Sequence, residues 1–355
     1  MNWYFFIMAI IVSSIVLFIA IFIISKYLWT RESKIRKYFI KLCITAFTVI
    51  LLFLVTEVYF RFFFIQTDNF AFTLSSKLWL SKYWTPINSF GYRDTEHSES
   101  SLNGKKIIFV VGDSFVAGYG IKNYQDRFPN VLQKKLGQDY VVINIAQGGW
   151  ATEDEYNAIL SYPHKPDIIV LSYSMNDITD SASVQKMGLG INKSINLPPT
   201  TGIIKYFCDV SYSFNYFYYI LYRFYKSRDI NEASLKNTLT CFLNETIWQN
   251  HKSSLLNIIN YAKDQKIELI VLVFPLLVTR RAMKFGKIFT SKTVDFMKLN
   301  KVTVIDLVDK LMGRDPQELT VNALDGHPSV KLNREIGNLL VEYVYQADNK
   351  QKGQR

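Results

Sequence analysis

The stretch Ile107–Phe115, which reads IIFVVGDSF, decides the fold class of this 355-residue chain. Its five leading residues are all β-branched or aromatic, as in a strand that is covered on both faces of a parallel sheet. The run stops at Gly112, and Ser114 follows at the carboxyl edge of the strand, where such sheets bind their ligands. Because Asp and Ser are also ordinary turn residues, the Gly-Asp-Ser tripeptide alone indicates a nucleophile only weakly.

Four more runs of similar composition follow this first strand, which we place at Lys106–Gly112. They are Tyr140–Ile145, Asp167–Ser172, Ile267–Phe274 and Val302–Leu307. Helical patterns separate them, and at the start of one helix Thr152 and Glu155 form a predicted capping box. The alternation predicts an α/β fold, a three-layer α/β/α sandwich with a mostly parallel five-stranded sheet of the flavodoxin type.

Three later segments place reactive side chains at the ends of predicted strands or before the last helix. They are Asn144–Thr152 with Gly149, Ser174–Asp177 with Asn176, and Asp325–Pro328 with His327. Attack on an ester carbonyl needs a nucleophile, donors for the oxyanion, and a base with an orienting acid. Together with the serine after the first strand, these segments supply all of them.

In their order along the chain, the segments resemble the four sequence blocks of the SGNH (GDSL-type) hydrolases and acyltransferases, over residues 88–345. The resemblance implies that Ser114 is the nucleophile and His327 the general base. It also implies that the backbone N–H groups of Ser114 and Gly149 and the side-chain amide of Asn176 stabilise the oxyanion.

Two positions depart from the pattern of that family. Ser174 replaces the glycine that usually begins the third block, and Leu324 occupies the usual position of the acid, three residues before His327. Asp325 stands two residues before His327, and we expect it to orient the imidazole. A backbone carbonyl is the alternative holder of the ring.

Each of these residues also has an ordinary structural explanation. Ser114 suits a helix N-cap, and Gly149 and Asn176 suit turns. We expect Asp113 and Asp177 to bond loop backbone around the site. The other histidines lie in contexts that indicate solvated surface, and they are His97, His164 and His251.

Two apolar runs precede the predicted sandwich. The run Trp3–Ile24 has no charged residue and is long enough to span a bilayer. A second run, Leu42–Ile65, contains Glu57 and Arg61 four residues apart, so that they share one helix face and can pair. We expect a two-span membrane anchor. A buried core helix is the alternative for either run, and a cleaved signal peptide is an alternative for the first.

The segment 26–41 between the two runs is basic, with six Lys or Arg residues against the single acid Glu32. Six minus one gives +5, nearly half of the net charge of +11. Since positive residues near membrane ends stay in the cytoplasm, we expect both termini and the sandwich to lie outside it, in the periplasm or at the cell exterior. The basicity therefore indicates topology and anionic lipid rather than nucleic acid, for which no binding motif is present.

We divide the chain into an anchor at 1–65, a pre-domain segment at 66–105 and a catalytic domain at 106–355. In the pre-domain segment, Asn88–Asp94 either resembles a segment that precedes the first block in membrane-anchored relatives or forms a Gly turn with a surface Arg–Asp pair. The insertion 178–250 is rich in Tyr and Phe and has no predicted strand. It packs a core of its own, contacts membrane or sugar, or, as we propose, covers the Ser114 site.

No Cys/His cluster has metal-ligand spacing, and we expect neither a metal nor a cofactor. Cys208 and Cys241 fall in the outer domain, where they form a disulfide or remain free thiols. The basic run 280–301 is typical of a solvated helix face, with an anionic membrane or glycan as alternative contacts.

The sequence thus predicts a serine esterase that acts on acyl esters, O-acetyl esters in particular, of an envelope or extracellular glycan or lipid. An O-acyltransferase that modifies an envelope glycan would use the same acyl-serine chemistry and is the first alternative. The second alternative is a non-catalytic binding or assembly module that keeps the fold.

Overall fold

The protein divides into two compact units. A computed structural model describes residues 19–20, 22–24, 26, 34–181, 201–277 and 279–353, without the side chains of 35–36 and 227–235. Residues 1–65 and 201–218 make up the N-terminal unit, and residues 66–200 and 219–355 make up the sandwich unit.

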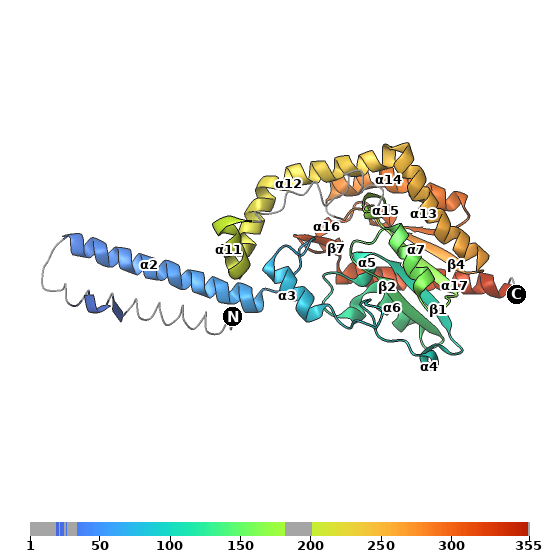
Figure 1. The fold of residues 1–355 in the computed structure, drawn as a ribbon, viewed down its shortest axis with the longest axis horizontal. Coiled ribbons are helices and arrows are strands. Elements are labelled where there is room, and N and C mark those ends of the chain that lie inside the picture. The colour runs from blue at the N-terminus through green and yellow to red at the C-terminus, as the bar shows by residue number, and fades with distance from the viewer. Residues whose placement is uncertain are drawn as a thin grey trace. The chain divides into compact units, whose positions relative to one another are not determined.

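The sandwich unit is built on a five-stranded parallel sheet (Figure 1), which confirms the predicted fold class. The strands are β1 (Lys106–Gly112), β2 (Tyr140–Ala146), β3 (Ile168–Tyr173), β4 (Glu268–Val273) and β5 (Thr303–Asp306). Their order is β2-β1-β3-β4-β5, so the chain turns to opposite sides of β1 after β1 and after β2. Ligands of such sheets bind at this switch point, beyond the carboxyl ends of β1 and β3.

Helices cover both faces of the sheet (Figure 1). Because side chains alternate along a strand, Ile108 and Val110 of β1 pack on one face, while Phe109 and Val111 pack on the other. On the first face lie α6 (Phe128–Leu136) and α17 (Val330–Gly353), and on the second lie α7 (Thr152–Ser161) and α13 (Glu245–Asp264). Helix α14 (Arg280–Leu299) contributes to both cores.

Short elements connect these layers. They are α3 (Leu74–Tyr83), α4 (Glu99–Leu102), α5 (Ser114–Ala117), η3 (Tyr124–Asp126), α8 (Asn176–Thr179), α15 (Leu307–Leu311) and α16 (Pro316–Leu319). Two short strands, β6 (Thr320–Asn322) and β7 (Asp325–Pro328), form an antiparallel pair before α17. The sequence predicts only a loop there, because Asp, Gly and Pro are poor strand formers.

The predicted capping box of α7 is wrong by one residue. The helix begins at Thr152, so Ala151 is its N-cap and Asp154 stands at the third position. The Asp154 carboxylate accepts a hydrogen bond from the Ala151 N–H at 3.0 Å, and Glu155 is instead buried in the protein interior.

The segment Asn88–Asp94 is part of the sandwich, and its description as a turn with a surface Arg–Asp pair is wrong. The Asn88 side chain accepts hydrogen bonds from two N–H groups within the turn. Arg93 is only 1% exposed. Its guanidinium donates to four backbone carbonyls, those of Tyr83, Ala117, Gly118 and Ile121. This arginine therefore fixes the pre-domain segment to the turn that follows α5.

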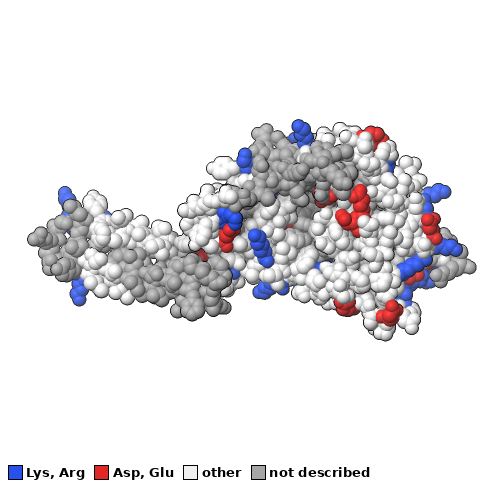
Figure 2. All heavy atoms as spheres, viewed as in Figure 1, with Lys and Arg blue, Asp and Glu red and all other residues white. Residues whose placement is uncertain are grey.

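The N-terminal unit contains α2 (Lys34–Val58), η2 (Tyr59–Phe63), α11 (Gly202–Val210) and the first turns of α12 (Tyr212–Leu243). Among the described residues, one helical stretch, Lys37–Phe62, is long and apolar enough to cross a membrane, in agreement with the second predicted run. On the face that Figure 2 shows, the described atoms of this stretch are almost all uncharged beyond its basic start. The first predicted run, Trp3–Ile24, lies almost wholly outside the described residues.

The described part of the insertion is helical, as its lack of a strand pattern predicts. Helix α12 passes from one unit to the other between Tyr218 and Tyr219. Tyr219 is buried, whereas Phe224 and Tyr225 are largely exposed, so the insertion does not simply bury its own rings. The cysteines of the described chain are free thiols, namely Cys43, Cys208 and Cys241.

Candidate active site

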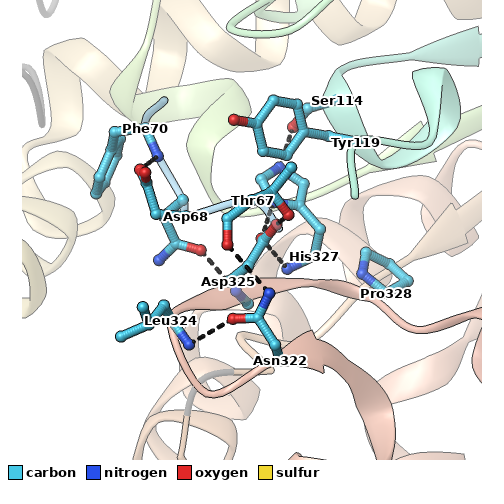
Figure 3. Close-up of polar contacts among 12 residues, drawn as sticks. Thr67, Asp68, Phe70, Ser114, Tyr119, Asn322, Leu324, Asp325, His327 and Pro328 are labelled. Atoms are coloured by element: carbon cyan, nitrogen blue, oxygen red, sulfur yellow. Dashed lines mark hydrogen bonds and ion pairs between the residues drawn. The ribbon is translucent and has the colours of Figure 1, made fainter. Parts of the chain in front are cut away.

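Ser114, His327 and Asp325 form one hydrogen-bonded series (Figure 3). Ser114 is the first residue of α5, and the Asp113 carboxylate caps this turn by accepting from the Phe115 N–H at 2.8 Å. The Ser114 Oγ lies 2.8 Å from His327 Nε2. On the other side of the ring, His327 Nδ1 lies 2.5 Å from Asp325 Oδ1. The structure thus brings together three residues that are predicted from the sequence.

The unusual spacing of Asp325 and His327 follows from their place in a strand. Residues two apart in a strand point to the same face, so in β7 the carboxylate reaches the imidazole directly. The same carboxylate oxygen also accepts from the His327 N–H at 3.1 Å. Leu324 stands at the position that the family uses for its acid. Its backbone carbonyl accepts a hydrogen bond from the Arg223 side chain at 2.8 Å.

Burial and charge act in opposite directions on the two titratable partners. Burial raises the pKa of Asp325, but the charge and hydrogen bonds of His327 and the Thr67 hydroxyl outweigh this effect, so the pKa lies below its usual value. Burial lowers the pKa of His327, but the carboxylate of Asp325, with those of Asp113 and Asp68, raises it more, so it lies above its usual value. The carboxylate therefore stays ionised and stabilises the imidazolium.

The segment directly after the N-terminal unit forms part of this site, which sequence reasoning missed. The Thr67 hydroxyl donates to Asp325 Oδ2, the oxygen that His327 does not use (Figure 3). Asn69 accepts from the Gly326 N–H at 2.6 Å, and Asn322 donates to the Thr67 carbonyl at 3.0 Å. Asp68 holds the segment's own turn by accepting from the backbone of Phe70, Phe72 and Thr73.

Two aromatic rings flank the imidazole of His327. The ring of Tyr119 lies 4.7 Å from it, between centroids, and that of Phe115 lies 5.4 Å from it, edge to face. The Tyr119 hydroxyl is 2.9 Å from the Ser76 hydroxyl, which links the ring to α3. These contacts restrict the imidazole to one orientation.

The predicted oxyanion donors lie at the same edge of the sheet. The Ser114 N–H is at the first position of α5, where helices have no internal acceptor. Gly149 has a φ of 80°, which favours glycine, and a Cβ placed on its neighbour Gly148 would lie 3.8 Å from the Ser114 Cβ. Asn176 begins α8 and donates to Asp113 Oδ2 at 2.8 Å. Asp113 thus connects the serine turn with the asparagine turn.

Ser174, where the family has glycine, takes part in this connection. Its hydroxyl lies within hydrogen-bond distance of Asp113 Oδ2, at 3.1 Å, and of the Asn176 side-chain oxygen, and its one proton is donated to either of them. Asp177 accepts from the Ser174 N–H at 2.9 Å. Asp113 and Asp177 therefore bond loop residues around the site, as predicted from the sequence.

Acidic side chains beneath the loops do not form a metal centre. Both carboxyl oxygens of Glu155 are buried, with no hydrogen-bond partner among the residues that the structure describes. Burial, with Asp113 nearby, raises the pKa of Glu155 well above its usual value. Across the described residues, no group of three or more His, Cys, Asp or Glu side chains is arranged to hold a metal ion.

The assignment of His251 to solvated surface is wrong. His251 is buried in α13 and lies 3.0 Å from the Tyr173 hydroxyl, and burial lowers its pKa to about 3. It stands four residues before Leu255, so the apolar stripe of α13, extended by one turn, predicts its burial. His97 and His164 are also partly buried, and His97 Nε2 is 3.1 Å from Asp94.

Comparison with known proteins identifies the family. Residues 110–334 match the model of the GDSL-like Lipase/Acylhydrolase family, which is more than half of the chain, and the protein belongs to this family. No curated protein matches it.

Solved structures similar to this chain are distant in sequence. A protein from Desulfitobacterium hafniense DCB-2, assigned to the lipolytic G-D-S-L family, is 14% identical with a TM-score of 0.41 and covers 67% of this chain and 99% of its own. A carbohydrate acetylesterase family member from Sinorhizobium meliloti is 15% identical with a TM-score of 0.38, over 68% and 98%. Esterase EstA from Pseudoalteromonas sp. is 13% identical with a TM-score of 0.38, over 69% and 100%.

Proposed function

We propose that this protein is a serine esterase that cleaves acyl esters through a covalent acyl-Ser114 intermediate. The observation that carries the proposal is the series from Ser114 Oγ through the His327 ring to the Asp325 carboxylate, with distances of 2.8 and 2.5 Å. A nucleophile bonded to a base that is in turn oriented by a buried acid is the arrangement that acyl transfer requires.

The first half of the reaction forms the acyl-enzyme. His327 Nε2 takes the proton of Ser114 Oγ, and the oxygen attacks the ester carbonyl carbon. The N–H groups of Ser114 and Gly149 and the Asn176 amide stabilise the oxyanion. When the tetrahedral intermediate collapses, the bond to the alcohol oxygen breaks, and the alcohol leaves with the proton from His327.

The second half of the reaction returns the enzyme to its starting state. Water gives a proton to His327 and attacks the acyl carbon, the bond to Ser114 breaks, and the serine oxygen takes the proton back. Asp325 stays ionised throughout and stabilises each imidazolium. Its lowered pKa and the raised pKa of His327 support this division of roles.

We extend the proposal to O-acetyl groups on a cell-envelope or extracellular glycan or lipid. Its support is the apolar helix Lys37–Phe62 together with the basic segment before it. In this arrangement a two-span anchor leaves the sandwich unit outside the cytoplasm. An alkaline phosphatase fusion after Gln66 should be active and one within 31–37 inactive. The reverse pattern would place the esterase in the cytoplasm and remove the envelope substrate.

The test of the activity uses the full-length protein in detergent micelles with p-nitrophenyl acetate. We expect p-nitrophenolate release that disappears in Ser114→Ala, and fluorophosphonate labelling of the wild type only. A second arm adds a glycan acceptor. Acetyl appearing on the glycan at the expense of free acetate would identify an O-acyltransferase. The absence of both acetate release and labelling would favour the alternative that the protein is a non-catalytic binding module.

A further inference from the structure

Helix α11 exposes an apolar face that its own unit does not cover. Ile203, Tyr206 and Phe207 are 73%, 60% and 44% exposed, and with Val210 they recur at the spacing of one helix face. Lys205 and Asp209 pair with each other on the opposite side. The helix is therefore amphipathic, with its polar side self-paired and its apolar side open.

The position of this helix is fixed by Glu57, near the end of the stretch Lys37–Phe62. Its carboxylate caps the N-terminus of α12, where it accepts from the N–H groups of Tyr212 and Ser213, both at 3.0 Å. The hydroxyls of Ser211 and Ser213 also donate to it, both at 2.8 Å. A helix N-terminus favours a negative charge, and Glu57 supplies one from another segment.

Arg61 completes the same joint from the other side. It donates to Glu57 at 2.6 and 3.1 Å, which confirms the predicted pair. It also donates to the carbonyl of Val210, the last residue of α11, at 2.8 Å, and stacks over the Tyr212 ring at 4.8 Å. One ion pair therefore caps the end of α11 and the start of α12 together.

Aromatic packing strengthens the joint within this unit. The ring of Phe60 lies 4.8 Å from that of Tyr216 and 5.3 Å from that of Phe217. Hydrogen bonds, an ion pair and ring contacts thus hold α11 at the level of the last turns of the apolar helix. That level is the boundary of a membrane which the helix Lys37–Phe62 would cross.

We propose that α11 is an interfacial helix whose apolar face lies in the boundary between lipid headgroups and acyl chains. The occupant of the exposed face is the bilayer, because α11 is bonded through Val210 to Arg61, near the end of the apolar helix that would cross the membrane. Amphipathic helices with exposed aromatic and aliphatic side chains bind in this layer, and Tyr side chains favour it. The proposal depends on the membrane helix and not on the ester chemistry.

The test places a fluorescent probe on α11 in the full-length protein. The cysteines are replaced by alanine, Ile203→Cys is labelled with NBD, and the protein is reconstituted into phosphatidylcholine–phosphatidylglycerol liposomes. Leu299→Cys, in the sandwich unit and 82% exposed, is the matched control. We expect lipids with a nitroxide near the headgroup to quench the α11 probe at least twofold more than the control, and aqueous iodide to show the reverse.

Quenching of the α11 probe by iodide alone, or by neither agent, would overturn the proposal, since the face would then contact water or protein. Glu57→Ala tests the joint separately, with Thr56→Ala on the same helix as its control. We expect Glu57→Ala to reduce lipid quenching at position 203 at least twofold and Thr56→Ala to leave it unchanged. Equal quenching in both would show that the joint does not set the depth of α11. A thermal melt checks folding independently of any esterase activity.

Discussion

The candidate active site consists of two halves that are held in different ways. Ser114 and Asn176 follow adjacent parallel strands, β1 and β3, whose ladder fixes their positions. Asp325 and His327 lie in a two-stranded hairpin outside this sheet. An isolated hairpin is marginally stable at best. The strand-edge half therefore needs only the sheet, whereas the hairpin half needs support from elsewhere.

That support comes from the segment that follows the N-terminal unit. Asn69 donates to the Leu324 carbonyl at 3.2 Å and accepts from the Gly326 N–H at 2.6 Å, so it spans the turn of the hairpin. Thr67 contacts Asp325 itself. One half of the site is therefore encoded locally, and the other by residues more than 250 positions away.

The largest expected effect is in the strand-edge half. Ser114→Ala removes the nucleophile and should reduce turnover of an aryl acetate on the order of 10⁶-fold, as loss of a triad serine does. Its melting temperature should stay near that of the wild type, because the hydroxyl is not part of the core. Stopped assays of acetate release measure the turnover, and calorimetry measures the melting temperature. A variant with more than a tenth of the wild-type rate would mean that Ser114 is not the nucleophile.

The next largest effect tests the acid of the hairpin half. Asp325→Asn should reduce turnover on the order of 10⁴-fold, by analogy with the same substitution of the triad aspartate in trypsin. Adding Leu324→Asp to this variant restores an acid at the family's usual position. It should not restore the rate, because Leu324 lies in the turn before β7, outside the strand that places the side chains of residues 325 and 327 on one face. Recovery to within tenfold of the wild type would show that backbone conformation does not decide which acid is used.

Sequence predicted the strand-edge half well, because its signals are local. The apolar run before Ser114 and the strand before Asn176 indicate a parallel sheet, and chain order at a sheet edge then brings the two together. Asp325 is predicted as the acid because it is close to His327 in sequence. The strand and the hairpin that bring the two side chains together cannot be predicted from the segment Asp325–Pro328, because it contains Gly and Pro.

Other features depend on tertiary contacts that leave little trace in sequence. The role of Thr67 cannot be predicted from the sequence, because a Thr-Asp-Asn run is typical of any turn. The cap of α7 is misplaced because the buried Glu155 mimics the glutamate of a capping box. The burial of Arg93 follows from carbonyls supplied by two separate segments of the chain, at Tyr83 and at 117–121.

A smaller effect is expected where the supporting segment contacts the acid. Thr67→Val keeps the shape of the side chain and removes the hydrogen bond to Asp325. A hydrogen bond to a charged group contributes about 1.5–3 kcal/mol, so kcat should fall roughly 10- to 100-fold if this bond holds the carboxylate in place. Thr67→Ser should retain most of the rate, and Ser81→Ala, on an exposed hydroxyl of α3, should have no effect. Equal rates for Thr67→Val and wild type would show that the hairpin half positions itself.

The smallest expected effect is on the pH dependence of kcat/KM, which the hairpin half sets because His327 must accept the proton of Ser114. Burial lowers the pKa of His327, but Asp325, with smaller contributions from Asp113 and Asp68, raises it more, and the net pKa lies above the ordinary value of about 6.5. A general base works only when neutral, so kcat/KM should fall as the pH drops through this pKa, with a tenfold loss per unit below it. Asp325→Asn removes the largest raising contribution and leaves burial, opposed only by the charges of Asp113 and Asp68, so its residual activity should lose rate at lower pH than the wild type. Thr67→Val keeps the carboxylate and should move the acid limb much less.

Profiles measured on p-nitrophenyl acetate from pH 5 to 9 compare the three proteins. An acid limb that Asp325→Asn leaves in place would mean that a group other than His327 titrates, and the two halves of the site would then not be coupled through the imidazole.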